Sequence, residues 1–319
     1  VTLKSNNSMQ TIRLNAIVFT SLLAILISNS LVAQRTQQKK SDYERLGLQG
    51  NVKELTESYF DIQEKFGTPT DIFKGKWIYK FNDRHQTIEK LYYGEYSESP
   101  FERYTYSYNQ EGLLEKYYEG SPTYPRKPRE YKYDNMGRLI REDDTSTFGE
   151  VVIYKYNERG LLQEEAHYSN GGDLKLKSIL SYDNQGRLIK EESYDRSGPN
   201  EKPFEVWTYK YDLAGNVSQE HKEGITNWSR MEANYTYQRG ILRSKEMWDN
   251  SYVITSEYDS KGNIIREESV SHSGAKWYLR LFKYDLIDSK GNWLIQVRSD
   301  EVSEGIYEPT KKVKRDISY

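Results

Sequence analysis

Residues 131–142 read YKYDNMGRLIRE, and this stretch decides the fold that we expect. Tyr131 and Tyr133 are two positions apart, so they share one face of an extended strand while the residue between them lies on the other. Asp134 opens a turn, and Gly137 takes the position with positive φ that closes a hairpin with a bulge. The segment therefore predicts two antiparallel strands with apolar side chains on a common face.

The same segment recurs along most of the chain, with successive turn glycines 22 to 29 residues apart. Each glycine is followed two positions later by an apolar residue, and in most copies a tyrosine stands four positions before it. The turn glycines are Gly112, Gly137, Gly160, Gly186, Gly215, Gly240, Gly262 and Gly291. The repeat tyrosines are Tyr108, Tyr133, Tyr156, Tyr182, Tyr211 and Tyr258.

A single hairpin is not stable alone in water, but hairpins in series cover one another. We therefore expect an all-β protein of tandem antiparallel β-hairpin repeats stacked into an extended, twisted or curled sheet, with the tyrosines in columns on one face. The repeat domain covers residues 51–319, after a lead segment at 34–50. Within it, Val52–Phe60 alternates like an edge strand, and Lys311–Tyr319 is a charged final strand or tail. The charges of both segments suit caps on the two open edges of the sheet.

The amino-terminal segment has the features of a signal peptide, which we expect over residues 1–33 with Met9 as the initiator. Arg13 supplies a positive charge, residues 16–27 form an apolar run, and Ala33 is a small residue at a cleavage position. A membrane helix needs about 20 apolar residues, so the alternative of an uncleaved anchor fits less well. We expect an exported protein that is periplasmic, cell-surface or extracellular, with no transmembrane segment in its mature chain.

Composition excludes several classes of function. Lys and Arg number 46 against 48 Asp and Glu, which leaves no basic excess to hold a nucleic-acid backbone. The absence of cysteine excludes disulfides, thiolate metal sites and a cysteine nucleophile. The aromatic fraction of 14% argues against disorder, because disordered chains are poor in aromatic residues.

No catalytic motif stands out in the sequence. The four histidines fall in different repeats, and only His167 and His221 stand near the same hairpin end. Carboxylate pairs such as Glu191 and Glu192 are adjacent in a strand, so they point to opposite faces and cannot act together as the two acids of a glycosidase. They are typical of a solvated strand face. We expect no catalytic residue, no metal and no cofactor.

Aromatic residues outside the columns are the better functional candidates. Trp228, Trp248 and Trp277 fall in or beside the variable loops, and Tyr168 and Tyr194 stand at outer strand ends. Loops on a rigid scaffold often carry recognition, and exposed rings stack on sugar faces or on partner side chains. These five residues are the predicted ligand-binding set.

The pattern Y-x-Y-[DN]-x-x-G-[RN]-[LI] resembles the YD repeat of the rearrangement-hotspot (RHS) and teneurin-like proteins, over roughly residues 77–296. The resemblance implies a β-hairpin ribbon that spirals into a shell, with carbohydrate binding and enclosure of a toxin as associated roles. This chain has only about nine copies and lacks the core motif of the large members, so it is more similar to small secreted YD-repeat proteins.

With so few hairpins, we expect the sheet to stay open and not to enclose a passenger. The resemblance and the loop aromatics together indicate a non-enzymatic protein that binds a glycan or cell-envelope polysaccharide. Two alternatives stay open. One is a protein–protein scaffold or adhesin with an envelope protein as its partner, and the other is a hydrolase whose site has no known motif.

Overall fold

The computed structural model describes residues 41–319, apart from residues 66, 122–123, 126, 147–148, 196–201 and 225–229. The signal peptide expected over residues 1–33 lies outside the described residues. Within the described part, no helix has the length and apolar character needed to cross a membrane.

The described chain is almost entirely β-strand, preceded by one short helix, α2 (Asp42–Arg45). The strands are β1 (Glu54–Lys65), β2 (Thr68–Phe81), β3 (Thr87–Gly94), β4 (Glu102–Tyr108), β5 (Leu114–Ser121), β6 (Tyr124–Pro125), β7 (Arg129–Tyr133), β8 (Leu139–Asp144), β9 (Glu150–Tyr156), β10 (Leu162–Ser169), β11 (Leu174–Tyr182), β12 (Leu188–Asp195), β13 (Glu205–Tyr211), β14 (Val217–Gly224), β15 (Met231–Gln238), β16 (Ile241–Trp248), β17 (Tyr252–Tyr258), β18 (Ile264–Ser271), β19 (Lys276–Ile287), β20 (Trp293–Ser303) and β21 (Ile306–Ser318). The all-β prediction is confirmed.

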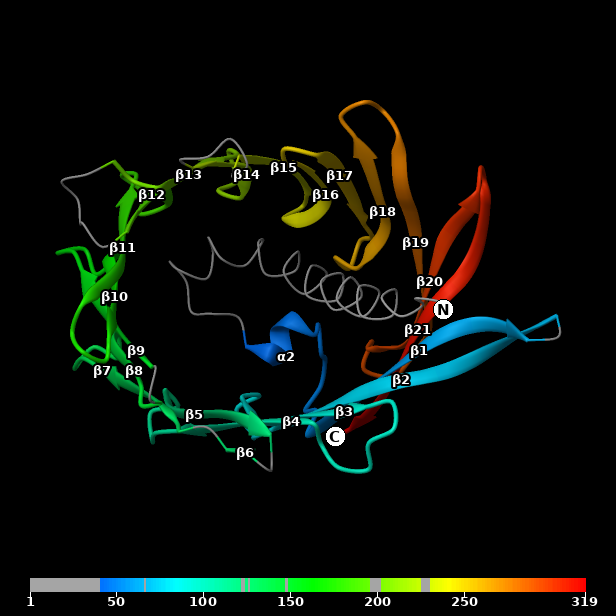
Figure 1. The fold of residues 1–319 in the computed structure, drawn as a ribbon, viewed down its shortest axis with the longest axis horizontal. Coiled ribbons are helices and arrows are strands. Elements are labelled where there is room, and N and C mark those ends of the chain that lie inside the picture. Colours follow the sequence, from blue (N-terminus) through cyan, green and yellow to red (C-terminus); the bar gives the residue numbers. More distant parts are fainter. Residues whose placement is uncertain are drawn as a thin grey trace, which may run out of the picture. The chain divides into compact units, whose positions relative to one another are not determined.

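The strands close into a ring, as Figure 1 shows. Each strand pairs antiparallel with the next along the chain, except that β5 pairs with both the short β6 and β7. The last strand, β21, then pairs with the first, β1, from Glu54 opposite Ser318 to Asp61 opposite Lys311. Leaving β6 aside, twenty strands form a closed antiparallel barrel.

The prediction of an open sheet is therefore wrong, and the reason lies in its two ends. The segments expected to cap separate edges pair with each other along what we call the seam, the ladder between β1 and β21. Their charges form ion pairs across it, Glu57 with Arg315 and Asp61 with Lys311. Among the described strands, closure leaves only the two-residue β6 paired on one side, which is a more complete solution than charged caps.

The repeat tyrosines lie on the inner face of the ring. The helix α2 lies inside the ring in Figure 1, where Tyr43 packs edge-on against Phe81 with ring centroids 5.2 Å apart. Tyr79, two positions before Phe81 on β2, belongs to the same buried cluster. Cross-strand register carries this face around the ring, because side chains directly opposite each other share a face.

The tyrosine hydroxyls join successive hairpins. Each of six tyrosines donates a hydrogen bond, at 2.6–3.0 Å, to the backbone carbonyl of the first residue in a strand of the preceding hairpin. The pairs are Tyr108 with Thr87, Tyr133 with Leu114, Tyr156 with Leu139, Tyr182 with Leu162, Tyr211 with Leu188, and Tyr284 with Ile264. A buried phenol needs such a partner, so the ring packs while its hydroxyl stays satisfied.

The turns follow the geometry that the sequence suggests. Gly137 has φ 76°, and the Asp134 carboxylate accepts hydrogen bonds from the backbone N–H groups of Met136 and Arg138, both at 2.9 Å. An alanine at Gly137 would be strained at this φ. The aspartate therefore shapes the turn, and the glycine closes it.

Replacing Tyr133 by Phe is expected to lower the free energy of unfolding by about 1 kcal/mol, because the Leu114 carbonyl loses its hydrogen bond while the ring still packs. Urea unfolding measures the change. The control is Tyr118→Phe, since Tyr118 is 39% exposed and stands opposite Thr105, on the outer face. Equal effects of the two substitutions would contradict the role of the hydroxyl.

Candidate functional site

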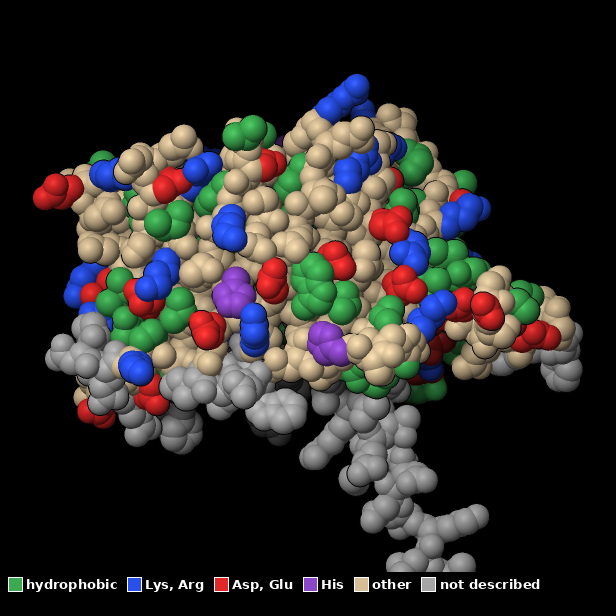
Figure 2. Space-filling model, turned by 90° about the horizontal axis from the view of Figure 1, so that it is seen from above, with side chains coloured by type: hydrophobic (Ala, Val, Ile, Leu, Met, Phe, Trp, Pro, Cys, Tyr) green, Lys and Arg blue, Asp and Glu red, His purple; other side chains and the backbone are tan. Residues whose placement is uncertain are grey.

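The outer face of the ring carries a lattice of ion pairs. Glu164 accepts from Lys155 at 2.8 Å and lies 2.7 Å from Lys177, while Arg266 bridges Glu257 and Glu268. Figure 2 shows Lys, Arg, Asp and Glu side chains interspersed over one face of the molecule, without a large area of one sign. Charged side chains are costly to bury in apolar surroundings, so the outer face of the ring is suited to contact with water.

The inner face carries a second set of charges, which we call the inner belt. Its members share one place in the repeat, five positions after the turn glycine, and each stands opposite an inward side chain of the neighbouring strand. The inner belt consists of Glu142, Glu165, Glu191, Glu220, Lys245 and Glu267. The last four are at most 6% exposed.

Adjacent carboxylates thus do point to opposite faces, as expected. The expectation that both are solvated is wrong for the carboxylates of the inner face. Glu191 stands opposite Leu180 and Trp207 on the inner face and is buried, whereas Glu192 points outward and lies 2.8 Å from Lys190. The sequence repeat fixes which of the two points inward. The degree of burial depends on the crowding of the inner face.

Glu220 and Lys245 of the inner belt are each 2% exposed and both contact Tyr235. The Tyr235 hydroxyl donates to Glu220 at 2.7 Å, and the Lys245 ammonium lies 5.4 Å from the centre of the Tyr235 ring. Burial raises the pKa of Glu220 and lowers the pKa of Lys245, and the attraction between the two charges opposes both shifts. The neutral forms are therefore favoured relative to the same groups in water.

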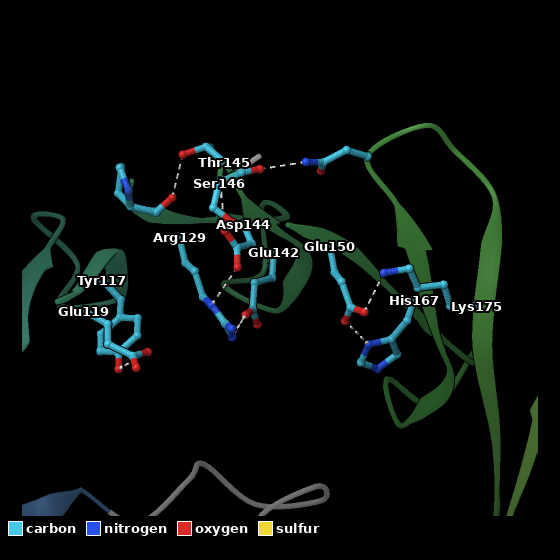
Figure 3. A network of polar contacts seen from close by, with 12 residues as sticks. Tyr117, Glu119, Arg129, Glu142, Asp144, Thr145, Ser146, Glu150, His167 and Lys175 are labelled. Atoms are coloured by element: carbon cyan, nitrogen blue, oxygen red, sulfur yellow. Dashed lines mark hydrogen bonds and ion pairs between the residues drawn. The ribbon is translucent and has the colours of Figure 1, made fainter. Parts of the chain in front are cut away.

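A polar network extends from the inner belt at β7 and β8, shown in Figure 3. The Arg129 guanidinium donates to Glu142 at 3.0 Å and lies 3.6 Å from Asp144. On the neighbouring strands, the Tyr117 hydroxyl donates to Glu119 at 3.3 Å. The network therefore satisfies its own charges and leaves mixed donors and acceptors along the wall.

His167 forms the other end of this network. Its Nε2 lies 2.9 Å from Glu165 and its Nδ1 lies 3.4 Å from Glu150, which also binds Lys175 at 3.0 Å. The hydrogen bond to Glu165 raises the pKa of His167 against an opposing effect of burial, and Glu150 adds to the rise. The imidazole therefore holds a proton to higher pH than a free histidine.

The other histidine of the pair expected near one hairpin end lies elsewhere. His221 stands opposite Thr208 and Glu232 on the outer face, whereas His167 stands on the inner face opposite Val152. The two do not converge. Among the residues that the structure describes, no group of three or more His, Asp and Glu side chains is arranged to hold a metal ion.

The members of the predicted aromatic set that the structure describes stand toward the loop rim, the edge of the ring opposite the turn glycines. Trp277 is 67% exposed near the start of β19, and its ring centre lies 4.6 Å from that of Tyr252. His272 lies in the loop after β18, and Asp249 lies in the loop after β16. The two loops are in contact, because the Nε2 of His272 lies 2.8 Å from the Asp249 carbonyl oxygen. Trp248, at the end of β16, stands opposite Val253. Two neighbouring hairpins thus present an aromatic pair.

The remaining members of the set do not join this pair. Tyr168 stands opposite Val151, and Tyr194 stands opposite Lys177 and is only 8% exposed. Trp228 lies outside the described residues. The sequence does not single out Tyr252, the partner of Trp277, because this tyrosine reads as the first residue of a strand. The pairing of β18 with both β17 and β19 is the signal that would have found it.

No protein-family model matches the chain, and no curated protein sequence matches it. The crystal structure of TcdB2-TccC3 is 11% identical with a TM-score of 0.42, over 78% of this chain and 15% of that one. A porin-like protein from Bacteroides uniformis is 10% identical with a TM-score of 0.36, over 85% of this chain and 98% of that one. The Tc holotoxin pore of Photorhabdus luminescens is 13% identical with a TM-score of 0.32, over 77% of this chain and 19% of that one.

All three TM-scores are too low for these structures to carry an argument about fold or function. The chain also spans less than a fifth of each toxin chain. The resemblance to YD-repeat proteins therefore rests on the sequence pattern itself.

Proposed function

We propose that this chain is a non-enzymatic binding protein that holds a glycan on its loop rim, at the pair formed by Trp277 and Tyr252. The observation that carries the proposal is a tryptophan that is 67% exposed and backed by a second ring at 4.6 Å. Export, expected from residues 1–33, is part of the proposal, because a cell-envelope or extracellular polysaccharide is the first candidate ligand.

The surroundings of the pair suit a sugar. An exposed indole offers an apolar surface for the C–H face of a pyranose, and the neighbouring Tyr252 ring, tilted by 50°, supports it. Polar groups stand beside it: the hydroxyls of Ser271 and Ser273, which lie 2.9 Å apart, and the ion pair of Lys276 with Glu301 at 2.8 Å. Rings that position a ligand and a few polar groups that orient it are the usual parts of such a site.

Replacing Trp277 by Ala is expected to weaken glycan binding at least about tenfold, because aromatic anchors often contribute about 2 kcal/mol or more. A glycan array identifies the ligand, and calorimetry on the best glycan measures the change. Tyr252→Ala should have a smaller effect in the same direction, because Tyr252 supports the indole.

The matched control is Tyr96→Ala, since Tyr96 is 91% exposed and belongs to the loop between β3 and β4. It should leave binding unchanged. A silent array would contradict the proposal, and so would equal losses in the Trp277 and Tyr96 variants. If the array is silent but an envelope protein binds in a manner that depends on Trp277, the alternative of a protein–protein scaffold replaces it.

A further inference from the structure

Lys90 is a partly buried amine on the inner face of the ring. It lies on β3, opposite Tyr79 of β2 and Tyr104 of β4. Its Nζ is 5.5 Å from the centre of the Trp77 ring, 5.4 Å from that of Tyr79 and 5.7 Å from that of Tyr104. The amine therefore ends in an aromatic cage built from two neighbouring strands.

The cage supplies little to hold a positive charge. Among the described residues, the nearest ion-pair partner of Lys90 is Asp42, at 3.9 Å, which is beyond hydrogen-bond distance. Asp42 is already engaged by Arg45 and by the Thr87 hydroxyl. Rings attract an ammonium by about 0.5–2 kcal/mol, which is less than the hydration that the cage removes.

The electrostatics of the cage favour the neutral amine. Burial is the larger cause and the positive charge of Arg45 the smaller one, and together they lower the pKa of Lys90 to about 8. The carboxylates of Glu102 and Glu57 oppose this shift without cancelling it. At pH 7.5 roughly a quarter of such an amine is unprotonated, against about 0.1% of an ordinary lysine.

We propose that Lys90 is a carbonyl-reactive lysine that captures aldehydes at the inner face of the ring as imines. The neutral nitrogen attacks the aldehyde carbon, and proton transfers within the adduct turn the carbonyl oxygen into water, which leaves as the C=N bond forms. No electrons are gained or lost in this step. The Lys90 side chain is 20% exposed, and the proposal requires that a small aldehyde reaches its nitrogen from the inner face.

The chain contains a matched control in Lys222. It is also an inward lysine, opposite Trp207, with its Nζ 5.3 Å from the centre of that ring. Its side chain is 25% exposed, close to the value for Lys90. One difference is Glu205, whose carboxylate lies 2.7 Å from the Lys222 ammonium. Exposure is thus similar, whereas Lys222 lies over one ring instead of three and has a carboxylate in contact.

The test treats the full chain with limiting propanal and sodium cyanoborohydride at pH 7.5, where hydride from the borohydride traps each imine as a secondary amine. Peptide mass spectrometry then gives the rate at every lysine. We expect Lys90 to react at least about tenfold faster than Lys222, because its nearest carboxylate is 3.9 Å away whereas that of Lys222 is in contact at 2.7 Å. Lys90→Arg, which keeps a cation in the cage, should remove the fast phase while circular dichroism stays unchanged.

Two further measurements separate this reactivity from simple accessibility. The rate at Lys90 should level off above pH about 8, whereas the rates of exposed lysines keep rising toward pH 10. In urea the difference between the reaction rates of Lys90 and Lys222 should vanish. Equal rates at Lys90 and Lys222 in the folded protein would overturn the proposal. Running glyceraldehyde beside hexanal shows whether sugar-like or lipid-like aldehydes are preferred, and neither result depends on the loop rim.

Discussion

Arg315→Met is expected to lower the free energy of unfolding by about 3–5 kcal/mol, because it leaves a buried carboxylate without its partner. Arg315 on β21 donates through Nε to Glu57 on β1 at 2.8 Å, and the two side chains are only 4% and 7% exposed. The pair lies in the seam, so the substitution weakens the strand pairing that closes the ring.

The surroundings of this pair explain the size of the effect. The guanidinium lies 3.5 Å from the centre of the Trp293 ring, and the Tyr59 hydroxyl donates to Glu57 at 2.9 Å. Removing Arg315 therefore takes away an ion pair and a cation–π contact and leaves Tyr59 alone to compensate the charge. Denaturant unfolding with linear extrapolation gives the free energy directly.

Lys311→Met is the matched control, because Lys311 pairs with Asp61 across the same seam. Its side chain is 37% exposed, and pairs of this kind contribute about 1 kcal/mol or less. The double variant Glu57→Leu/Arg315→Met should recover most of the loss, since no buried charge is left unpaired. If Arg315→Met costs no more than Lys311→Met, the seam does not depend on its buried pair.

The hairpin could be predicted from the sequence, whereas the closure of the ring could not. Alternation of residues in a strand shows which side chains share a face, and a glycine with positive φ shows where a strand returns. Neither shows which distant strand is the partner. Residues 54–61 and 311–318 each look like a charged edge, and only their pairing turns those charges into cross-strand ion pairs.

The same limit applies to the candidate site. The sequence singled out Trp277 from its place beside a loop, but its neighbour Tyr252 comes from another hairpin. The cage around Lys90 has the same origin, since Trp77 and Tyr104 flank it from strands on either side. Residues that strand register brings together cannot be identified from the sequence alone, whereas residues placed by a turn can.

Removing a second buried pair, Glu220 and Lys245, is expected to raise the free energy of unfolding, whereas removing Arg315 from the seam lowers it. The double variant Glu220→Gln/Lys245→Met should raise the free energy of unfolding by about 1–4 kcal/mol at pH 7.5. Glutamine keeps an oxygen that accepts from the Tyr235 hydroxyl, and methionine fills a similar volume against the same ring. Burial raises the pKa of Glu220 and lowers that of Lys245, so neither charge is fully compensated.

The pH dependence follows from these two directions. Because the pKa of Glu220 is raised, the contribution of its neutral form is fully present below the ordinary value of about 4.5 and is lost as the pH rises through the raised value. Because the pKa of Lys245 is lowered, its ammonium costs stability at every pH below the lowered value. The advantage of the double variant should therefore be smaller at pH 4.5 than at pH 7.5.

Unfolding in urea at both pH values tests this difference. The matched control is Lys190→Met/Glu192→Gln, an outward pair in which the lysine is 42% exposed, and it should change stability by less than about 1 kcal/mol at either pH. A double variant less stable than the parent at pH 7.5 would show that the inner belt stabilises the ring through its charges. The opposite result would mean that the ring keeps Glu220 and Lys245 at a cost in stability, which directs attention to what they contact on the inner face.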